Sequence, residues 1–361
     1  PNLNGDSMII SGLSLTAARD CVGLFGNPIL KGVTVTDLGL PNVVLSGQAK
    51  VGTLFPHLWG VGTNTFTNVW STGSVTGSGG YVGGLIGYAQ KGNVIVSGSW
   101  SKAVVTGTDR VGGLIGQAVE LEVNHLSITN SFFAGTVNTS TYGGGLVGYF
   151  GPFSAGVANL TIASSYNTGN ITGSGSYVGG LLGRSQSSTG THAVSNSYST
   201  GAISGTSYVG GLIGLVGVGT LTMSSSYSTG NITGSNSFVG GLIGNSQGAA
   251  TLTDSYATGN VTNTVTDTGG IIGKGTSVTL TNVYATGTIN GAAKTGGIFG
   301  GSDFGGTYTF TDCYSTGAAS GTIQIGGIVG YITRSVLNVR RSYATGNVTG
   351  TSSQVGGLVG V

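Results

Sequence analysis

A six-residue glycine motif that recurs about every 30 residues constrains the fold of this chain more than any other feature. A clear copy is Val82-Gly83-Gly84-Leu85-Ile86-Gly87. A fixed period of this length is the signature of a repeat architecture, in which similar units stack on one another. Successive copies lie 27 to 35 residues apart, and their second glycines are Gly84, Gly113, Gly145, Gly180, Gly211, Gly241, Gly270, Gly297, Gly327 and Gly357.

Two weaker copies extend the repeat toward the N-terminus. They are Thr53-Leu54-Phe55-Pro56 and Gly23-Leu24-Phe25-Gly26, which raise the expected number of units to twelve. We therefore expect one domain over residues 1–361, with divergent leading coils in 1–60 and regular repeats in 61–361. The chain ends within a motif copy, so we expect an uncapped last coil that is covered by a longer parent chain or by another copy in a filament.

An aromatic residue marks a second fixed point in each unit. In Tyr166-Asn167-Thr168-Gly169, as in other copies, the aromatic is followed by a small residue, threonine and glycine. The second glycine of the next motif follows the aromatic by 13 or 14 residues, whereas the other limb of the unit takes 14 to 21 residues. One limb of constant length and one that accepts insertions are typical of a coil with loops on one face.

The composition favours short strands and a folded chain. Glycine supplies 73 of the 361 residues, and apolar stretches are interrupted every few residues by Gly, Asn or Ser, which leaves no helical periodicity. Apolar residues make up 38% of the chain and charged residues only 6%, which excludes a disordered chain. A 30-residue coil cannot bury its own apolar edge, but stacked coils form long parallel sheets. We predict an all-β, parallel β-solenoid (β-helix) of about twelve coils, right-handed by the usual crossover preference, with a left-handed stack as the open alternative.

Charge and hydropathy exclude two classes of partner. The formal net charge is +2, which is too small for a basic surface that binds nucleic acid or an anionic membrane. No apolar run approaches the roughly 18 residues of a membrane span. We therefore expect neither nucleic-acid binding nor membrane insertion.

The motif V-G-G-L-[IV]-G, with its upstream partner [YW]-x-T-G, resembles the GLUG repeat, and the resemblance extends from Gly23 to Gly360. It implies large bacterial proteins that are secreted or on the cell surface, namely adhesins related to filamentous haemagglutinins and the non-catalytic regions of some secreted peptidases. The leading hypothesis is a non-enzymatic, extracellular structural or adhesive solenoid within an adhesin or filament. Its partners are other copies or a longer parent chain, and host-surface or matrix glycans. Two alternatives stay open: a glycan- or ice-binding face, and the scaffold region of a larger secreted peptidase.

The residues that usually carry chemistry are scattered. The glycine motif is not followed by a helix whose N-terminus could bind phosphate, so it implies no cofactor. The ten acidic residues lie mostly one to a coil, and the one small group, Glu120, Glu122 and His125, is expected to solvate a loop. We predict no catalytic set and no metal site. Cys21 and Cys313 lie about ten coils apart, too far for a disulfide.

The aromatic markers form the main candidate surface. Stacked coils place them in one ladder, with a threonine two residues further along the same side of each strand. The strip is solvent-exposed if the small neighbours point inward, and part of the core if they point outward; the sequence leaves both open. Its members are Trp70, Trp100, Phe132, Tyr166, Tyr198, Tyr227, Tyr256, Tyr284, Tyr314 and Tyr343.

A long insertion supplies a second candidate surface. The segment between Gly145 and Tyr166 is the longest of the variable limbs and carries Tyr149, Phe150 and Phe153. Aromatic residues on a loop are typical contact residues, so we expect these three to contact a partner.

Overall fold

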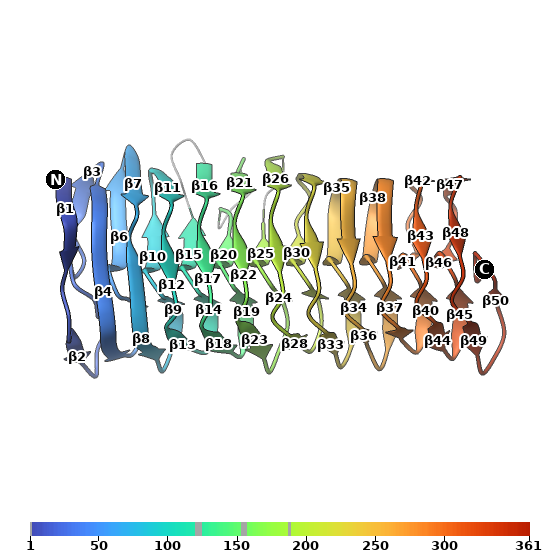
Figure 1. Ribbon diagram of the computed structural model, residues 1–361, viewed down its shortest axis with the longest axis horizontal. Coiled ribbons are helices and arrows are strands. Elements are labelled where there is room, and N and C mark those ends of the chain that lie inside the picture. The colour runs from blue at the N-terminus through green and yellow to red at the C-terminus, as the bar shows by residue number, and fades with distance from the viewer. Residues whose placement is uncertain (1, 120–124, 153–156, 187–188) are drawn as a thin grey trace.

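The protein is a rod of stacked β-coils with its termini at opposite ends (Figure 1). This computed structural model describes residues 2–119, 125–152, 157–186 and 189–361. The described residues form fifty strands and no helix, and every pairing between strands is parallel. The predicted all-β parallel solenoid is confirmed.

One sheet contains the first half of each glycine motif, one strand per coil. Its eleven strands indicate about eleven turns rather than twelve, because Val22, beside the weak copy at 23–26, makes only an isolated bridge to Val51. The strands are β5 (Val51–Gly52), β9 (Gly80–Gly83), β14 (Asp109–Gly112), β19 (Thr141–Gly144), β24 (Val178–Gly179), β29 (Val209–Gly210), β34 (Ser237–Gly240), β37 (Thr266–Gly269), β40 (Ala293–Gly296), β45 (Ile323–Gly326) and β50 (Val355–Gly356).

The other described strands form one continuous sheet around the remaining faces. The strands that follow the glycine pair are β6 (Phe55–Val61), β10 (Ile86–Gln90), β15 (Ile115–Val119), β20 (Val147–Phe150), β25 (Leu182–Ser185), β30 (Ile213–Val216), β41 (Phe299–Ser302) and β46 (Val329–Ile332). The next along the coil are β7 (Thr63–Thr67), β11 (Asn93–Ser97), β16 (His125–Thr129), β21 (Asn159–Ala163), β26 (Thr191–Ser195), β31 (Thr220–Ser224), β42 (Thr307–Thr311) and β47 (Val336–Arg340).

Two further sets complete the coil. The aromatic markers begin β12 (Trp100–Ser101), β17 (Phe132–Phe133), β22 (Tyr166–Asn167), β27 (Tyr198–Ser199), β32 (Tyr227–Ser228), β43 (Tyr314–Ser315) and β48 (Tyr343–Ala344). The last set is β13 (Val104–Thr106), β18 (Thr136–Thr139), β23 (Asn170–Gly173), β28 (Ile203–Gly205), β33 (Ile232–Gly234), β36 (Val261–Thr262), β39 (Ile289–Asn290), β44 (Ala319–Gly321) and β49 (Val348–Gly350). Longer strands that merge neighbouring sets, and the leading strands, are β4 (Thr34–Gly47), β8 (Trp70–Gly77), β35 (Ile243–Ala257), β38 (Ile272–Ala285), β1 (Asn2–Ile9), β2 (Ser14–Thr16) and β3 (Ile29–Lys31).

The glycine pair lets the chain turn a sharp corner where the coil is narrow. A Cβ atom on Gly211 would lie 2.0 Å from the carbonyl oxygen of Gly241 in the next coil. It would also lie 2.4 Å from Oγ of Ser228, which belongs to the aromatic-marker strand β32. No side chain fits there, because real Cβ atoms do not approach so closely. The same contact explains why a small residue follows the aromatic marker, since Ser228 follows Tyr227 and packs on Gly211.

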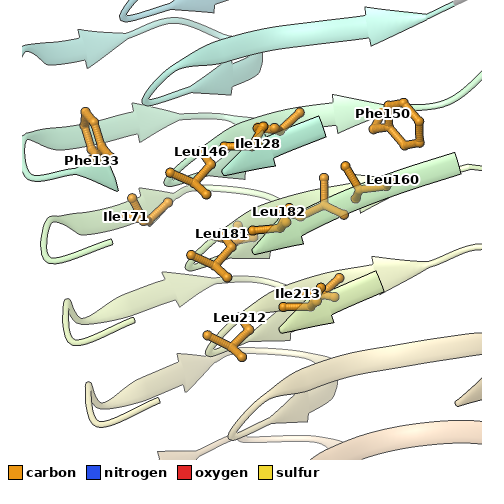
Figure 2. Close-up of a cluster of buried hydrophobic side chains, with 14 of the residues drawn as sticks. Ile128, Phe133, Leu146, Phe150, Leu160, Ile171, Leu181, Leu182, Leu212 and Ile213 are labelled. Carbon is orange, nitrogen blue, oxygen red and sulfur yellow. The ribbon is translucent and has the colours of Figure 1, made fainter. Parts of the chain in front are cut away.

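A continuous hydrophobic core runs along the rod. The leucines after successive glycine pairs, Leu146, Leu181 and Leu212, lie above one another, and Leu182 and Ile213 form the column beside them (Figure 2). Since each apolar side chain packs on its counterpart in the neighbouring coils, the core continues from coil to coil. Both thiols are free, and Cys313 lies in this core.

Candidate functional site

The aromatic ladder lies outside the core. Around β32 the neighbours of Tyr227, which are Ser226 and Ser228, are buried, whereas the Tyr227 side chain is half-buried and Thr229 is exposed. The other coils repeat this alternation; for example, Tyr198 lies between buried Ser197 and Ser199. The small residues therefore point inward and the aromatics outward, which decides between the two orientations that the sequence left open.

The rings of the ladder stack face to face along its whole length. Neighbouring ring centroids are 4.7 to 5.5 Å apart and the ring planes are within 7° of parallel, from Trp70 to Tyr343. Each inner ring thus has both faces covered and presents its edge to solvent, together with the hydroxyl group where the ring is a tyrosine. Burial and neighbouring tyrosines raise the pKa of Tyr198 and Tyr284, so these hydroxyls stay protonated at neutral pH. The ladder's role as a binding site stays a prediction.

The loop candidates lie elsewhere than expected. Strand β20 continues through Phe150, whose side chain is 0% exposed and packs in the core, edge-on to His192. The expectation that Phe150 contacts a partner is wrong, because the alternation of β20 directs it inward. Tyr149 points to the outer side of the same strand but is covered by neighbouring rings. Phe153 lies outside the described residues.

A second row of side chains follows the glycine corners, and we call it the corner strip. It consists of the residues at the two ends of each corner, seven positions apart, which lie outside the main core, and in several pairs the two side chains contact each other. The rings of Tyr81 and Tyr88 are 5.1 Å apart, and those of Tyr142 and Tyr149 are 5.6 Å apart. The pairs of the strip are Tyr81 and Tyr88, Arg110 and Gln117, Tyr142 and Tyr149, Tyr177 and Arg184, Tyr208 and Leu215, Phe238 and Asn245, Asp267 and Lys274, and Lys294 and Gly301.

Two arginines are held among the tyrosines of the corner strip. The guanidinium carbon of Arg110 lies 5.1 Å from the Tyr81 ring centre and 5.5 Å from that of Tyr142, and Nη1 donates to the Tyr81 hydroxyl at 3.3 Å. Arg184 lies 5.0 Å from the Tyr177 ring centre and donates to the Tyr142 hydroxyl at 3.3 Å. These cation–π contacts orient both guanidinium groups, and the Arg110 guanidinium is also paired with the carboxylate of Asp109.

Several polar atoms in the strip have unused hydrogen-bonding capacity. Gln117 is 0% exposed, and neither atom of its amide has a hydrogen-bond partner within the described residues. The Nε atoms of Arg110 and Arg184 are likewise buried without an acceptor in that part of the chain. Buried polar groups normally have partners, so unpaired ones identify a place where a ligand or water would be stabilised.

The backbone of the corner strip is also unusual. Its first position has positive φ in successive coils even where the residue is large, as at Tyr81 (64°), Arg110 (53°), Tyr177 (69°) and Phe238 (67°). Bulky residues rarely adopt this left-handed conformation, which costs energy relative to glycine. Large side chains at a strained position indicate a role for them outside the core.

The sequence contained a signal for the corner strip. An aromatic residue directly precedes the first glycine-motif residue at Tyr81, Tyr142, Tyr177, Tyr208 and Phe238. What it did not contain is the corner itself, which brings residues seven positions apart onto one surface. In a continuous strand, positions seven apart lie on opposite faces.

The fold and its ordered outer ladders define a parallel β-solenoid repeat protein, a structural class of molecule. Residues 235–262 match the family model described as the GLUG motif, so the chain contains a GLUG repeat in this segment. GLUG repeats occur in extracellular bacterial proteins and build structural, non-catalytic folds. No curated protein and no solved structure matches the chain. Within the described residues, no helix has the length and apolar character needed to cross a membrane.

Proposed function

We propose that the protein is a non-enzymatic, extracellular structural and adhesive rod, part of a cell-surface adhesin or extracellular filament. The observation that carries this is the unbroken succession of coils, each of which pairs its strands with the next and shares one core with it. Such a rod holds surface side chains in regular rows at a fixed distance from its ends. Its partners are other copies or a longer parent chain.

The corner strip is the adhesive surface that the geometry supports best. Tyrosine edges, two guanidinium groups and unpaired buried amide and guanidinium nitrogens lie together over the coils from Tyr81 to Tyr208. Arginine recognises carboxylate and sulfate groups by paired hydrogen bonds. We therefore propose acidic host-surface or matrix glycans as the ligand class.

A glycan array that contains acidic and neutral polysaccharides tests this proposal. We expect the wild-type protein to bind acidic glycans, and the double variant R110Q/R184Q to lose at least tenfold in affinity. R340Q removes an exposed arginine outside the strip and serves as the matched control. Equal loss in R340Q, or no binding of acidic glycans by the folded wild type, would overturn the proposal.

The ladder supports a second candidate, a face for ice or neutral glycans. Its threonines Thr200, Thr229 and Thr258 are exposed and repeat once per coil beside the row of tyrosine hydroxyls. Since the inner ring faces are covered, sugars would meet only ring edges and hydroxyls. An ice-recrystallisation assay with T200K, T229K and T258K variants, alongside the glycan array, separates this candidate from the corner strip.

A third candidate is the scaffold region of a larger secreted peptidase. It rests on the GLUG resemblance alone. The sequence of the parent gene decides it, because a peptidase domain in the same reading frame would make this rod a scaffold.

A further inference from the structure

Four charged side chains gather at the C-terminal end of the corner strip. The carboxylate of Asp303 lies between two lysines: Nζ of Lys274 is 3.0 Å from its Oδ2, and Nζ of Lys294 contacts its Oδ1. Lys294 lies in β40, before the glycine corner, and Asp303 directly follows β41, after the corner. Lys274 belongs to the preceding coil, in register with Gly301.

The two lysines are largely shielded from water by aromatic rings. Their side chains are only 12% and 18% exposed, against 43% for Asp303. Nζ of Lys274 lies 5.1 Å from the ring centre of Phe238 and 5.2 Å from that of Phe304, and Nζ of Lys294 lies 4.9 Å from that of Tyr331. Burial acts to raise the pKa of the Asp303 carboxyl, but hydrogen bonds and charges from Lys294 and Lys274 lower it overall, so the carboxylate is held between the two lysines.

The fourth group, Asp267, is a buried acid beside Lys294. It is 2% exposed, its Oδ2 accepts a hydrogen bond from Thr266 at 3.2 Å, and its Oδ1 has no hydrogen-bond partner within the described residues. Burial raises the pKa of this carboxyl, against the lowering effect of Lys274 and Lys294. A Cβ atom on Gly301 would lie 3.2 Å from both Asp267 Oδ1 and Lys294 Cβ, so this glycine leaves room for the acid beside the lysine.

We propose that Lys294 and Asp303 form an intramolecular isopeptide bond, with Asp267 transferring the protons and Lys274 stabilising the charge on Oδ2. This would be a covalent modification site, distinct from the adhesive function proposed above.

The step balances without any added reagent. A proton passes from the Lys294 ammonium to the Asp303 carboxylate, and the neutral Nζ then attacks Cγ to form the C–N bond. Negative charge develops on Oδ2, next to the Lys274 ammonium. Asp267 donates its proton to the departing hydroxyl group and takes one from the attacking nitrogen, so it ends unchanged. One C–O bond breaks and one water leaves, so that ammonium and carboxylate become an amide and water.

The bond would join the two strands that flank the glycine corner. It closes a ring across β40 and β41, at a corner where the backbone of Lys294 has positive φ (49°). A covalent closure of this kind restricts the unfolded chain and stabilises the coil.

Intact-mass spectrometry tests the proposal directly. The protein is purified in its folded state and denatured only for the measurement. We expect a mass about 18 Da below that of the sequence, which is the loss of one water. Trypsin should no longer cleave after Lys294. Chymotrypsin, which cleaves after Phe299, should yield two peptides that stay joined through Lys294 and Asp303.

Matched variants distinguish the bond from other dehydrations. D303A and K294R should show the full sequence mass, and D267N should slow or abolish the loss, with circular dichroism confirming that each variant is folded. D303N should lose about 17 Da, because ammonia replaces water as the leaving group. A folded wild type of full sequence mass with Lys294 open to trypsin, or an 18 Da loss that persists in D303A, overturns the proposal.

Discussion

In most coils a buried serine hydroxyl links the coil to the one before it. Oγ of Ser226 accepts the backbone N–H of Ser197 at 3.2 Å and donates to the carbonyl of Ser224 at 2.8 Å. Ser226 occupies the position directly before the aromatic marker, which we call the serine slot. Serines at this position in other coils make the same pair of hydrogen bonds, as at Ser165 and Ser197. The hydroxyl thereby satisfies a backbone donor that is enclosed in the core.

Removing one of these hydroxyls should destabilise the rod. In S226A the N–H of Ser197 loses its acceptor while it stays buried, and an unsatisfied buried donor costs about 1 to 3 kcal/mol. We expect a lower thermal midpoint by circular dichroism. T229A, three residues away on the exposed side, is the control and should leave the midpoint within error. Equal effects from both variants would contradict the role assigned to Ser226.

His192 is a polar residue in an apolar column. It pairs in register with Leu160 and Leu221, is almost fully buried, and neither ring nitrogen has a hydrogen-bond partner within the described residues. Burial lowers its pKa from 6.5 to about 4. The folded protein therefore holds this imidazole neutral over a pH range in which the unfolded chain would protonate it.

This difference predicts a loss of stability in acid. Between pH 6.5 and about 4 the unfolded state binds the extra proton, so stability falls as the pH falls through this window, by about 3 kcal/mol for a shift of this size. H192L replaces the histidine by leucine, which is the residue at this position in both neighbouring coils. It should remove this part of the pH dependence. Unfolding midpoints at pH 7 and pH 4.5 measure the effect, with H125Q as the control. An unchanged pH profile in H192L would contradict this account.

The aromatic ladder acts as an element because each inner ring contacts two others. Tyr227 lies 4.9 Å from Tyr198 and 4.8 Å from Tyr256, whereas Tyr343 at the end of the described ladder has one stacked ring, Tyr314, at 5.3 Å. Aromatic pairs contribute about 0.5 to 1.5 kcal/mol each beyond the area that they bury. The ladder thus stabilises the stack from outside while the core stabilises it from inside.

Truncation within the ladder should depend on position. We expect Y227A to cost about 1 to 3 kcal/mol, and Y343A about half as much, because Y343A removes one stacked pair instead of two. A double-mutant cycle provides the control: Tyr198 and Tyr227 should be coupled, whereas Tyr198 and Tyr284, three rings apart, should be additive. Equal coupling in both pairs would show that stacking is not the cause. Chemical denaturation of each variant gives these values.

The sequence predicted the elements better than it predicted their surfaces. The 30-residue period and the glycine motif predict a parallel solenoid, since a short β-coil buries its apolar edge by stacking on similar coils. Alternation in the strand around Tyr227 shows that Tyr and Thr share a face but not which face, because the small serine neighbours suit either side. Phe150 was misassigned because the end of its strand is set by pairing with β15 and β25, which a loop-length argument does not contain.

The corner strip marks the limit of such reasoning for the site. Tyr142 and Tyr149 meet only because the glycine pair between them bends the chain, and the cluster of Lys274, Lys294 and Asp303 also needs two neighbouring coils in register. Register between coils is set by core packing and by insertions of different length. It is therefore a property of the assembled rod that a single repeat does not reveal.

At the scale of the whole molecule, the rod is a one-dimensional stack. Each coil contacts mainly its neighbours, so stability is expected to be a sum of coil and interface terms. The equivalence of coils is close: Val209 pairs with Val239 and Ile213 with Ile243, which makes Gly211 equivalent to Gly241. A deletion that preserves the register of the stack must therefore remove one complete coil.

Deleting one complete coil should shorten the rod without unfolding it. Removal of residues 212–241 joins Gly211 to Leu242, which places Tyr198 next to Tyr256 in the ladder and Ser197 next to Ser255 in the serine slot. We expect a cooperative β-protein whose thermal midpoint lies within a few degrees of wild type, and whose maximum dimension in small-angle scattering is about 4.8 Å smaller. Removal of residues 212–226 is the matched control, because half a coil puts the aromatic strand where the corner strand belongs, and it should abolish cooperative folding. If both deletions fold equally well, or both fail, register between coils does not specify this rod.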